Sequence, residues 1–560
     1  MKKYFFCVVI IFLTILLLDF CRPQEKKYPN FIDNDMLLSQ NGLDSTNVRN
    51  LAMIGKVWGF VKYHYPNLDK KGIDIDKELF LLLDNANDEC ITEMLSDWII
   101  SLGDFRTNKD CKLELYDTTT YILTANYNWI SDTTYLCPRL CEQLNHLHLA
   151  KRRHGNYLYV QSQTGTIEHN VEKQYNIEKA TNIKYRLLTL FRYWNIIEYY
   201  YLYKPEGWNN ILLEYIVRFW NASSWNDYVE MIKEITSELE DSHARVKVYN
   251  QVKPRYIPIN ARMVNDNFII IGNSSEIPIG SEVLNINGLH PKDIRNNLIS
   301  KEHLSESNMS SLNRDMTMMG QYTDSMTVNL SFFYKQNFDN VVIKTITLDS
   351  ARIWIRENKT ALIPACNLIH DTIAYINAGA FRLKEANEYY KIIKKSKVAI
   401  FDLRSYPNDF MLFFLSKFFM PYKTPFVSFV IPLENEPGFF YYYKPKCIGT
   451  KHSDKFSGRI VILVNENTIS QGEYTAMALQ ACSNSITCGS QTAGADGNVS
   501  TIHLPLGIQT YYTGLGVLYP NGQQTQKSGI KIDIHIDPYI ENQFYYSPED
   551  ITDYIINLLH

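Results

Sequence analysis

The chain has 560 residues and a formal net charge of −4, with 21% charged residues. This length allows several domains with buried cores. A net negative charge does not give the positive potential that nucleic-acid binding requires. The sequence also has no phosphate-binding loop and no zinc-ligand spacing. We therefore expect a multidomain globular protein that binds neither nucleic acid nor a metal and needs no cofactor.

The N-terminus has the build of an export signal. Lys2 and Lys3 precede an apolar run, Tyr4 to Leu18, that is short for a membrane span. Cys21 follows and is similar to a bacterial lipoprotein acylation site, although Phe20 replaces the usual small residue. Residues 1–21 predict a signal segment and residues 22–45 a tether. The mature protein is expected in the bacterial cell envelope, in the periplasm or at the outer membrane, held by this lipid or by an uncleaved anchor.

Two segments of the N-terminal half match each other, which predicts a duplicated helical unit over 46–165 and 166–252. KVWGFVKYHYP around Trp58 corresponds to RYWNIIEYYYLY around Trp194, each with a tyrosine five positions after the tryptophan. We interpret these aromatic residues as helix-packing faces. The first copy has Phe105-Arg106 where the second has a Ser-His pair.

Over residues 253–350 the sequence pattern changes and predicts short strands with alternating side chains. GSEVLNINGLHPKDI, beginning at Gly280, predicts a strand, a tight Asn-Gly turn and the start of a helix. This sequence pattern resembles the carboxylate-binding region of a PDZ domain. A generic β-hairpin fits the same residues.

Strands alternate with helices over 365–545, which predicts a layered α/β core with active groups at strand ends. Residues 546–560 predict a C-terminal helix. Ile460 to Val464 is a continuous apolar run, as expected for a strand covered on both faces. Gln471 to Gln480 predicts a helix, so Ser470 lies at a strand-to-helix corner. The first-turn amides there, beginning with that of Gln471, suit an oxyanion.

Ser470 has two interpretations. It is a candidate nucleophile, or it is a helix N-cap with Glu473 completing a capping box, and the local pattern alone favours the cap. A serine nucleophile requires a base, and His243 lies in LEDSHARV, directly after an amphipathic helix. A lone histidine at a helix end is more often structural.

The order of several motifs reverses the local preference. A helical region ending in DSH, a PDZ-like segment, a D-L-R strand, a strand followed by Ser-x-x-Glu, a T-A-G loop and a terminal G-I-x-x-D resemble the tail-specific (C-terminal-processing) serine peptidases. NENTISQGE, GSQTAGADGN and YPNGQQTQKSGIKID carry the likeness most strongly. It is closest to the tricorn-like bacterial envelope branch, and it implies a C-terminal core of the ClpP/crotonase-like kind.

The resemblance implies a role for each matching residue. Ser470 is the nucleophile and His243 the base, with Ser242 beside it, and Gln526 matches the position of the usual glutamate. Ala495 and Asp496 stand where another branch carries a lysine base. The implied oxyanion donors are the backbone N–H of Gln471 and, in the SYPND loop, that of Asn408.

Three side chains of these loops need a separate interpretation. Asp402 and Arg404 are expected to build the loop and not to touch substrate. Asp496 is a cation or base site, or a turn residue, and Ala-Asp-Gly-Asn favours the turn.

The sequence thus predicts a serine endopeptidase that forms an acyl-enzyme on a peptide or protein substrate. A catalytically weakened peptide-binding scaffold on the same fold is the alternative, motivated by Gln526, Asn408 and Asp409. Hydrolysis of non-peptide esters uses the same Ser–His chemistry and stays open.

Overall fold

The structure is a computed structural model that describes residues 43–559, apart from 67, 69–70, 105–119, 151–158, 170, 249–254, 265–266, 273, 275, 303–325, 361–362, 452–453 and 537–547. The predicted signal segment, nearly all of the tether, Cys21 and Phe105-Arg106 lie outside the described residues. Among the helices that are described, none is long and apolar enough to cross a membrane.

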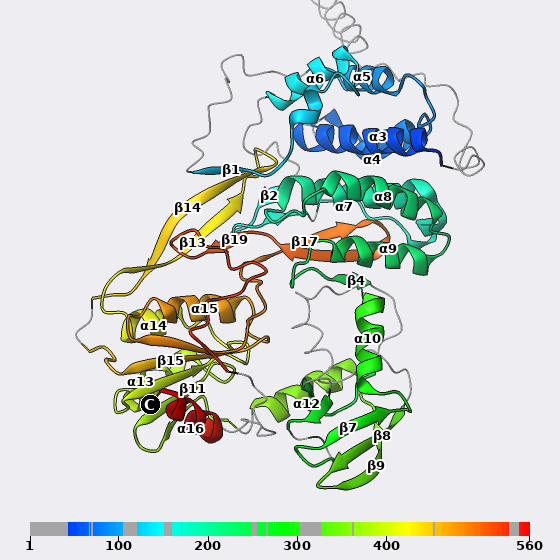
Figure 1. Ribbon diagram of the computed structural model, residues 1–560. Helices are drawn as coiled ribbons and strands as arrows, with labels where there is room; N and C mark the ends of the chain where they lie inside the picture. The colour runs from blue at the N-terminus through cyan, green and yellow to red at the C-terminus, as the bar shows by residue number, and fades with distance from the viewer. Residues whose placement is uncertain are drawn as a thin grey trace, which may run out of the picture. The chain divides into compact units, whose positions relative to one another are not determined.

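The N-terminal half of the described chain is mainly helical (Figure 1). Its helices are α3 (Ser45–His64), α4 (Ile75–Leu83), α5 (Ile91–Ser101), α6 (Pro138–His148), α7 (Ile183–Tyr200), α8 (Trp208–Asn221) and α9 (Trp225–Ser237), with the short 3-10 turns η2 (Asn128–Ser131) and η3 (Ile177–Thr181). Side chains cap the N-termini of most of these α-helices. The capping residues Asp44, Asp74, Asn182 and Ser224 accept backbone N–H groups there.

The two tryptophans of the matched segments make equivalent contacts. Trp58 Nε1 donates to the carbonyl of Ile75, the first residue of α4, at 2.8 Å. Trp194 Nε1 donates to the carbonyl of Trp208, the first residue of α8, at 2.9 Å. Both indoles are buried, so each joins a long helix to the beginning of the next one.

Helices α3 and α7 pack closely because small residues face larger ones. A Cβ added to Gly59 would come within 2.0 Å of the Asn195 side chain. Asn195 Nδ2 donates to the carbonyls of Gly55 and Phe191, at 3.0 and 2.8 Å. The amide therefore links the two helices at their crossing.

The C-terminal half contains a six-stranded sheet in the order β10-β11-β12-β15-β16-β20. The pair β10 and β11 is antiparallel and all other neighbours are parallel. The strands are β10 (Cys366–Ile369), β11 (Ile373–Asn377), β12 (Val398–Asp402), β15 (Arg459–Val464), β16 (Ser485–Gly489) and β20 (Ile534–His535); the helices are α13 (Ala386–Ile393), α14 (Leu412–Phe418), α15 (Gln471–Gln480) and α16 (Pro548–Leu559), with η6 (Leu383–Glu385).

Both faces of this sheet are covered, as the continuous apolar run predicts. Ile460, Ile462 and Val464 of β15 pack in one core with residues of α13, α14 and α15. Val461 and Leu463 point to the opposite core, which contains Ile551 and Ile555 of α16. The six-stranded sheet is therefore a central layer between helices.

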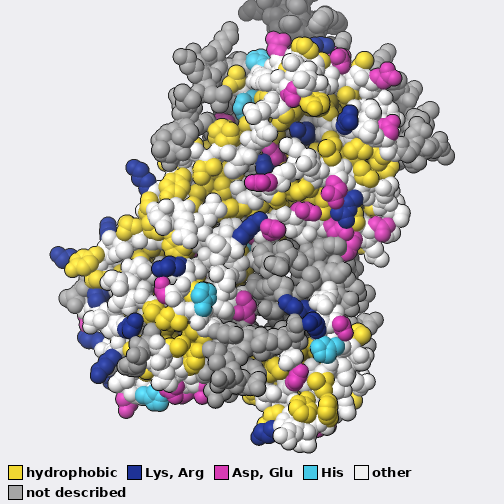
Figure 2. Space-filling view, viewed as in Figure 1, with side chains coloured by type: hydrophobic (Ala, Val, Ile, Leu, Met, Phe, Trp, Pro, Cys, Tyr) yellow, Lys and Arg dark blue, Asp and Glu magenta, His cyan; other side chains and the backbone are white. Residues whose placement is uncertain are grey.

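A long antiparallel hairpin continues from the α/β region. It consists of β13 (Thr424–Pro432) and β14 (Phe439–Ile448), flanked by β19 (Gly516–Leu518) and β1 (Tyr121–Leu123). Figure 2 shows apolar side chains gathered over these strands, where Ile122, Leu123 and Tyr443 are exposed. A second sheet pairs β17 (Val499–Leu504), β18 (Ile508–Thr513) and β4 (Val246–Val248), with η7 (Pro505–Gly507) joining the first two, and β2 (Val160–Gln161) pairs with β3 (Ile167–Glu168).

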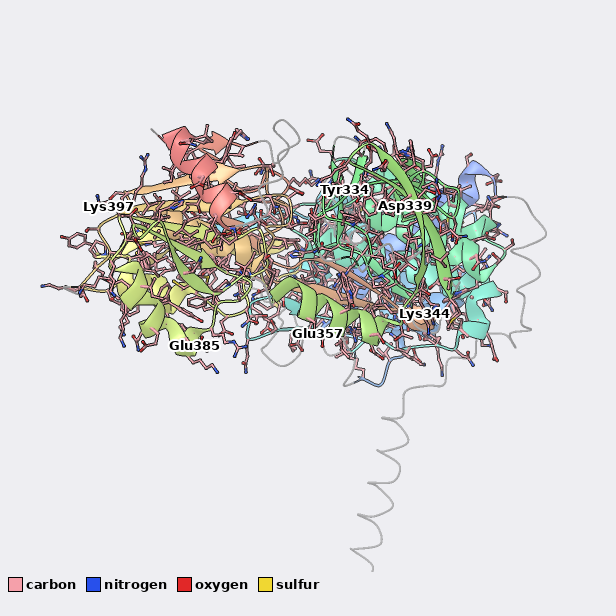
Figure 3. All side chains as sticks on the ribbon, turned by 90° about the horizontal axis from the view of Figure 1, so that it is seen from below. Tyr334, Asp339, Lys344, Glu357, Glu385 and Lys397 are labelled. Carbon is pink, nitrogen blue, oxygen red and sulfur yellow. The ribbon has the colours of Figure 1, made fainter. Side chains whose placement is uncertain are left out.

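Residues 253–350 contain a five-stranded antiparallel sheet. Its strands, in order, are β5 (Ala261–Val264), β6 (Asn267–Ile270), β7 (Glu282–Ile286), β8 (Thr327–Tyr334) and β9 (Asn337–Lys344), with α10 (Pro291–Glu302) and α12 (Leu348–Thr360) following β7 and β9. Figure 3 places Tyr334 and Asp339 at the turn of the last strand pair and Lys344 at its other end. Asn287 and Gly288 both have positive φ, as the predicted Asn-Gly turn requires.

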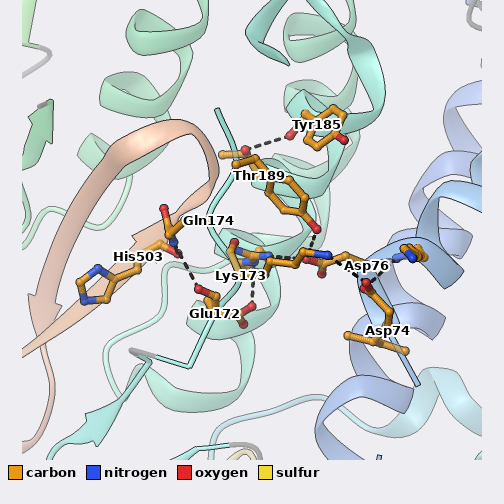
Figure 4. A network of polar contacts seen from close by, with 12 residues as sticks. Asp74, Asp76, Glu172, Lys173, Gln174, Tyr185, Thr189 and His503 are labelled. Atoms are coloured by element: carbon orange, nitrogen blue, oxygen red, sulfur yellow. Dashed lines mark hydrogen bonds and ion pairs between the residues drawn. The ribbon is translucent and has the colours of Figure 1, made fainter. Parts of the chain in front are cut away.

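A charged network is buried in the helical half. Lys62 Nζ contacts Glu172 Oε1 at 2.7 Å, and Arg192 contacts Glu172 Oε2 at 3.0 Å and Asp76 Oδ2 at 2.9 Å. The side chain of Arg192 is fully buried. Figure 4 shows the part of the network around Glu172, Asp76 and Asp74. Two carboxylates and two cations thus meet within a core where isolated charges would be costly.

The architecture is mixed α/β with several sheets, which confirms the predicted fold class at this level. Helix α16 spans Pro548–Leu559, and the cysteines in the described residues are free thiols. The domain limits inferred from sequence stay predictions.

Candidate active site

Ser470 lies where the chain passes from β15 to α15, as the sequence predicts. Its backbone has φ 54° and ψ −119°, a conformation that a non-glycine residue rarely adopts. An ordinary N-cap residue has extended backbone angles. The Ser470 N–H donates to the carbonyl of Ala495 at 3.1 Å, so the corner is fixed from outside the helix.

The side chain of Glu473 holds this corner in place through hydrogen bonds. Its side chain is fully buried and accepts Ser470 N–H at 3.3 Å, Ala495 N–H at 3.0 Å, Gly494 N–H at 2.9 Å and Thr492 Oγ1–H at 2.6 Å. Burial raises its pKa to about 7, against these four donors, which lower it. Glu473 therefore joins the serine backbone to the 492–495 loop.

The same loop holds the predicted base segment. Ser242 Oγ donates to the carbonyl of Ala493 at 2.8 Å in a buried contact. Ala493 N–H in turn donates to the carbonyl of Thr468, two residues before Ser470, at 3.0 Å. Ser242 of the Ser-His pair and Ser470 therefore both contact one short loop.

His243 follows α9 and precedes β4, at the predicted helix end. Its Nδ1 lies 3.0 Å from Thr513 Oγ1, at the end of β18. Asp241 accepts Thr513 Oγ1–H at 2.8 Å and Thr513 N–H at 2.7 Å, and it also accepts the N–H of His243 at 3.0 Å. Asp241 and Thr513 are fully buried.

Gln526 joins the same group of side chains. Its Nε2 donates to Thr513 Oγ1 at 3.3 Å, and the residue is 5% exposed. Its Oε1 is buried and accepts no hydrogen bond from the described residues. The structure therefore places Gln526 and His243 on one threonine hydroxyl, whereas Ser242 binds the 492–495 loop.

The two predicted oxyanion segments are neighbours. Gln471 Nε2 donates to the carbonyl of Asp409 at 3.0 Å, and the backbone N–H of Gln471 is the first amide of α15, which has no acceptor within the helix. The N–H of Asn408 donates to the carbonyl of Ala378 at 2.9 Å, and its Nδ2 donates to Phe381 O at 3.1 Å. An oxyanion role for Asn408 would require the first of these bonds to open.

Asp402 and Arg404 are engaged with each other. Arg404 donates to both oxygens of Asp402 at 2.9 Å, a bidentate ion pair. This agrees with the expectation that they build the loop.

Asp496 differs from an ordinary turn residue. It is 3% exposed, and its Oδ2 has no hydrogen-bond partner in the described part of the chain. Burial, with the neighbouring charge of Glu473, holds the pKa of Asp496 well above its usual range. A second carboxyl group that disfavours ionisation is thus present near the Ser470 corner.

Sequence patterns single out neither Asp241 nor Thr513. They indicate Glu473 only as the glutamate of the Ser-x-x-Glu capping box. The D-S-H triplet is the one local clue, because an aspartate two residues before a histidine can accept its N–H.

Comparison with known proteins identifies the class. Residues 425–536 match the sequence model of Peptidase family S41, so the chain carries an S41 peptidase domain in its C-terminal part. This match confirms the resemblance to tail-specific peptidases in the C-terminal part of the chain and supports a serine-type peptidase, a hydrolase. The matched range includes Ser470 and Gln526, while His243 lies before it. No curated protein matches the chain.

Solved structures share the fold. A point mutant of CPAF has a TM-score of 0.52 and 15% identity, covering 67% of this chain and 96% of that chain. Mature CPAF has a TM-score of 0.50 with the same identity and coverage. The photosystem II D1 C-terminal processing protease is more distant, with a TM-score of 0.38 and 13% identity, covering 63% of this chain and 94% of that chain.

Proposed function

We propose that this chain is an exported serine endopeptidase that cleaves peptide or protein substrates through an acyl-enzyme on Ser470, with His243 as the general base. The match to a peptidase family supports a peptide bond as the substrate, and the site residues are proposed to supply the chemistry. Export, the residue roles and endopeptidase action are parts of the proposal.

The proposed reaction follows the chemistry of serine hydrolases. His243 takes the proton of the Ser470 hydroxyl as the oxygen attacks the substrate carbonyl. The N–H of Gln471 donates to the resulting oxyanion, together with an N–H of the 405–409 loop, of which Asn408 is the sequence candidate. His243 then gives the proton to the departing amine, and water hydrolyses the ester.

The observation that carries the proposal is the backbone of Ser470. A residue at φ 54° and ψ −119° stores strain of about 1–3 kcal/mol, which persists only where the surroundings impose it. Here Glu473 and Ala495 impose it through hydrogen bonds to the Ser470 N–H. Such strain exceeds what a simple helix cap requires and is typical of an exposed nucleophile at a strand-to-helix turn.

The test is acylation by a serine-directed probe. Ser470→Ala should abolish labelling and proteolysis, whereas Ser528→Ala, at an exposed serine that donates to Gln524 O, should keep both. Undiminished turnover in Ser470→Ala would refute the assignment.

The five-stranded sheet is proposed to be the PDZ-like domain, which captures a peptide end. Its antiparallel strands, the Asn287-Gly288 turn and α10 support this proposal. Binding of a peptide with a free C-terminal carboxylate, and loss of binding on amidation of that end, would test it.

The helical half is proposed to be a duplicated unit. The equivalent indole bonds of Trp58 and Trp194 support a common ancestor for α3-α4 and α7-α8. Each indole bond should contribute comparably to stability when Trp58→Phe and Trp194→Phe are compared.

Export and a lipid on Cys21 are proposed from the N-terminal sequence, and with them a location in the bacterial envelope. Mass spectrometry of the membrane fraction tests this, because a Cys21-containing peptide without lipid would contradict it.

A peptide-binding scaffold is the second candidate, favoured by a neutral Gln526 beside the proposed base. Well-folded protein that binds peptides but is not acylated at Ser470 would establish this role in place of catalysis.

A further inference from the structure

The hydroxyl of Thr513 lies among three polar side chains. His243 Nδ1 is 3.0 Å away, Asp241 Oδ1 2.8 Å and Gln526 Nε2 3.3 Å. Thr513 is fully buried, so these contacts decide where its single proton points.

The donor count leaves one consistent arrangement. A threonine hydroxyl donates one hydrogen bond and accepts two, while an ionised carboxylate only accepts. The Thr513 proton therefore points to Asp241, and His243 Nδ1–H and Gln526 Nε2–H both donate to Oγ1. If the proton pointed to His243 instead, two oxygens 2.8 Å apart would face each other without a hydrogen between them. The neutral imidazole then has its proton on Nδ1 and its lone pair on Nε2.

Backbone hydrogen bonds hold the Asp241 side chain in place. Besides the Thr513 hydroxyl, it accepts the backbone N–H of Thr513 at 2.7 Å and that of His243 at 3.0 Å. Tyr193, Tyr201 and Tyr203 lie around it. Burial is the main cause that raises their pKa values, and the charge of Asp241 raises them further. These tyrosines are neutral at physiological pH, so they add no second negative charge beside Asp241.

Gln526 fits this arrangement better than the glutamate that the family resemblance implies. Thr513 has one proton, which Asp241 already accepts, so a second carboxylate at position 526 would face an oxygen that has nothing to donate. The amide instead donates to that oxygen. The neutral side chain and the nearby aspartate are therefore complementary.

We propose that Asp241 is the positioning carboxylate of this peptidase and acts through the Thr513 hydroxyl. It fixes His243 in the Nδ1–H form, which leaves the lone pair of Nε2 to accept the Ser470 proton, and it stabilises the imidazolium that then forms. No proton leaves Nδ1 or Thr513 in this step; the Ser470 proton moves to Nε2 and later to the amine. This inference rests on the proposed role of His243.

Nitrogen-15 NMR of histidine-labelled Ser470→Ala protein tests it without requiring proteolysis. The chain has 13 histidines, and the His243 signal is identified by its loss in His243→Asn. We expect the Nδ1–H tautomer at high pH. Asp241→Asn should lower the His243 pKa so that protonation weakens about tenfold or more, since an opposite charge is removed.

Thr513→Val is a variant that should still fold. Valine has nearly the same shape as threonine, and the backbone hydrogen bond from residue 513 to Asp241 remains. It should lower the His243 pKa and mix the two tautomers, whereas Thr513→Ser, which keeps the hydroxyl, should retain both wild-type values. Asp241→Asn combined with Gln526→Glu should restore the pKa, because the charge returns to the other side of Thr513.

Unchanged His243 pKa and tautomer in Thr513→Val would overturn the inference, whatever the activity. With Ser470 intact, Asp241→Asn should lower kcat at least a hundredfold with little change in KM, and shift the acidic limb of the pH–rate profile downward. Proteolysis that survives Ser470→Ala would defeat the proposed function, while the NMR result would still decide the role of Asp241.

Discussion

Glu473 offers the sharpest test of how the nucleophile corner is held. Four hydrogen bonds converge on this fully buried carboxylate, two of them from the backbone N–H groups of Ser470 and Ala495. Burial nevertheless raises its pKa to about 7. The structure therefore predicts that the corner loosens as Glu473 ionises, and that Glu473→Gln removes this dependence on pH.

The magnitude follows from linkage. Below pH 4.5 the carboxyl group is protonated in both the closed and the opened corner. Between pH 4.5 and about 7 the closed form keeps a proton that the opened form has lost, so rising pH favours opening, and the contribution is fully lost above about 7. At about 1.4 kcal/mol per pH unit, this amounts to roughly 3 kcal/mol, or more than a hundredfold in the opening equilibrium.

Hydrogen exchange followed by mass spectrometry measures this opening directly. Peptides covering residues 468–481 and 491–498 should lose protection, corrected for intrinsic rates, by about 3 kcal/mol between pH 4.5 and pH 8 in the wild type. Glu473→Gln should show a much flatter profile, since a glutamine does not titrate. The exposed carboxylate Glu388 on α13 provides the control variant Glu388→Gln, which should follow the wild type. Parallel profiles of the wild type and Glu473→Gln would refute the reasoning.

Two further predictions concern the helical half. Lys62→Met should lower the free energy of unfolding by about 3–5 kcal/mol, because Glu172 loses a buried partner at 2.7 Å; a thermal melt within a degree of the wild type would contradict this. Gly59→Ala should destabilise the α3–α7 crossing by about 1–3 kcal/mol, because the added Cβ would meet the Asn195 side chain at 2.0 Å. Asn195→Ala in the Gly59→Ala background should recover part of that loss in urea unfolding.

The sequence predicted the strand-to-helix corner at Ser470 well because local patterns determine it. An apolar run flanked by polar residues predicted β15, and α15 begins and ends at the predicted residues, Gln471 and Gln480. The tryptophan-based match between two segments likewise reflects contacts within short stretches of chain, those of each indole with the next helix. Periodicity and spacing record interactions of this kind.

The partners of His243 could not be predicted because they lie far away in the chain. Thr513 is 272 positions from Asp241, and it reaches the site only because β18 pairs with β4, which follows His243. No local pattern distinguishes Thr513 from the other polar residues of an alternating strand. The burial of Asp496 was missed for the same reason: Ala-Asp-Gly-Asn has the composition of a turn, and only the packed loop shows that the carboxyl group lies inside.

The two interpretations of Ser470 also prove to be less separate than the sequence suggested. The Ser-x-x-Glu spacing is that of a capping box, and Glu473 does accept the N–H of Ser470. Yet the same carboxylate accepts Gly494 and Ala495, and Ser470 has a positive φ that no ordinary cap adopts. A cap interaction extended to a second loop holds the serine in its strained conformation, and that loop also receives Ser242. Glu473 therefore couples the helix start to the segment that carries His243, so a change at this buried residue should act on both members of the proposed Ser470–His243 pair.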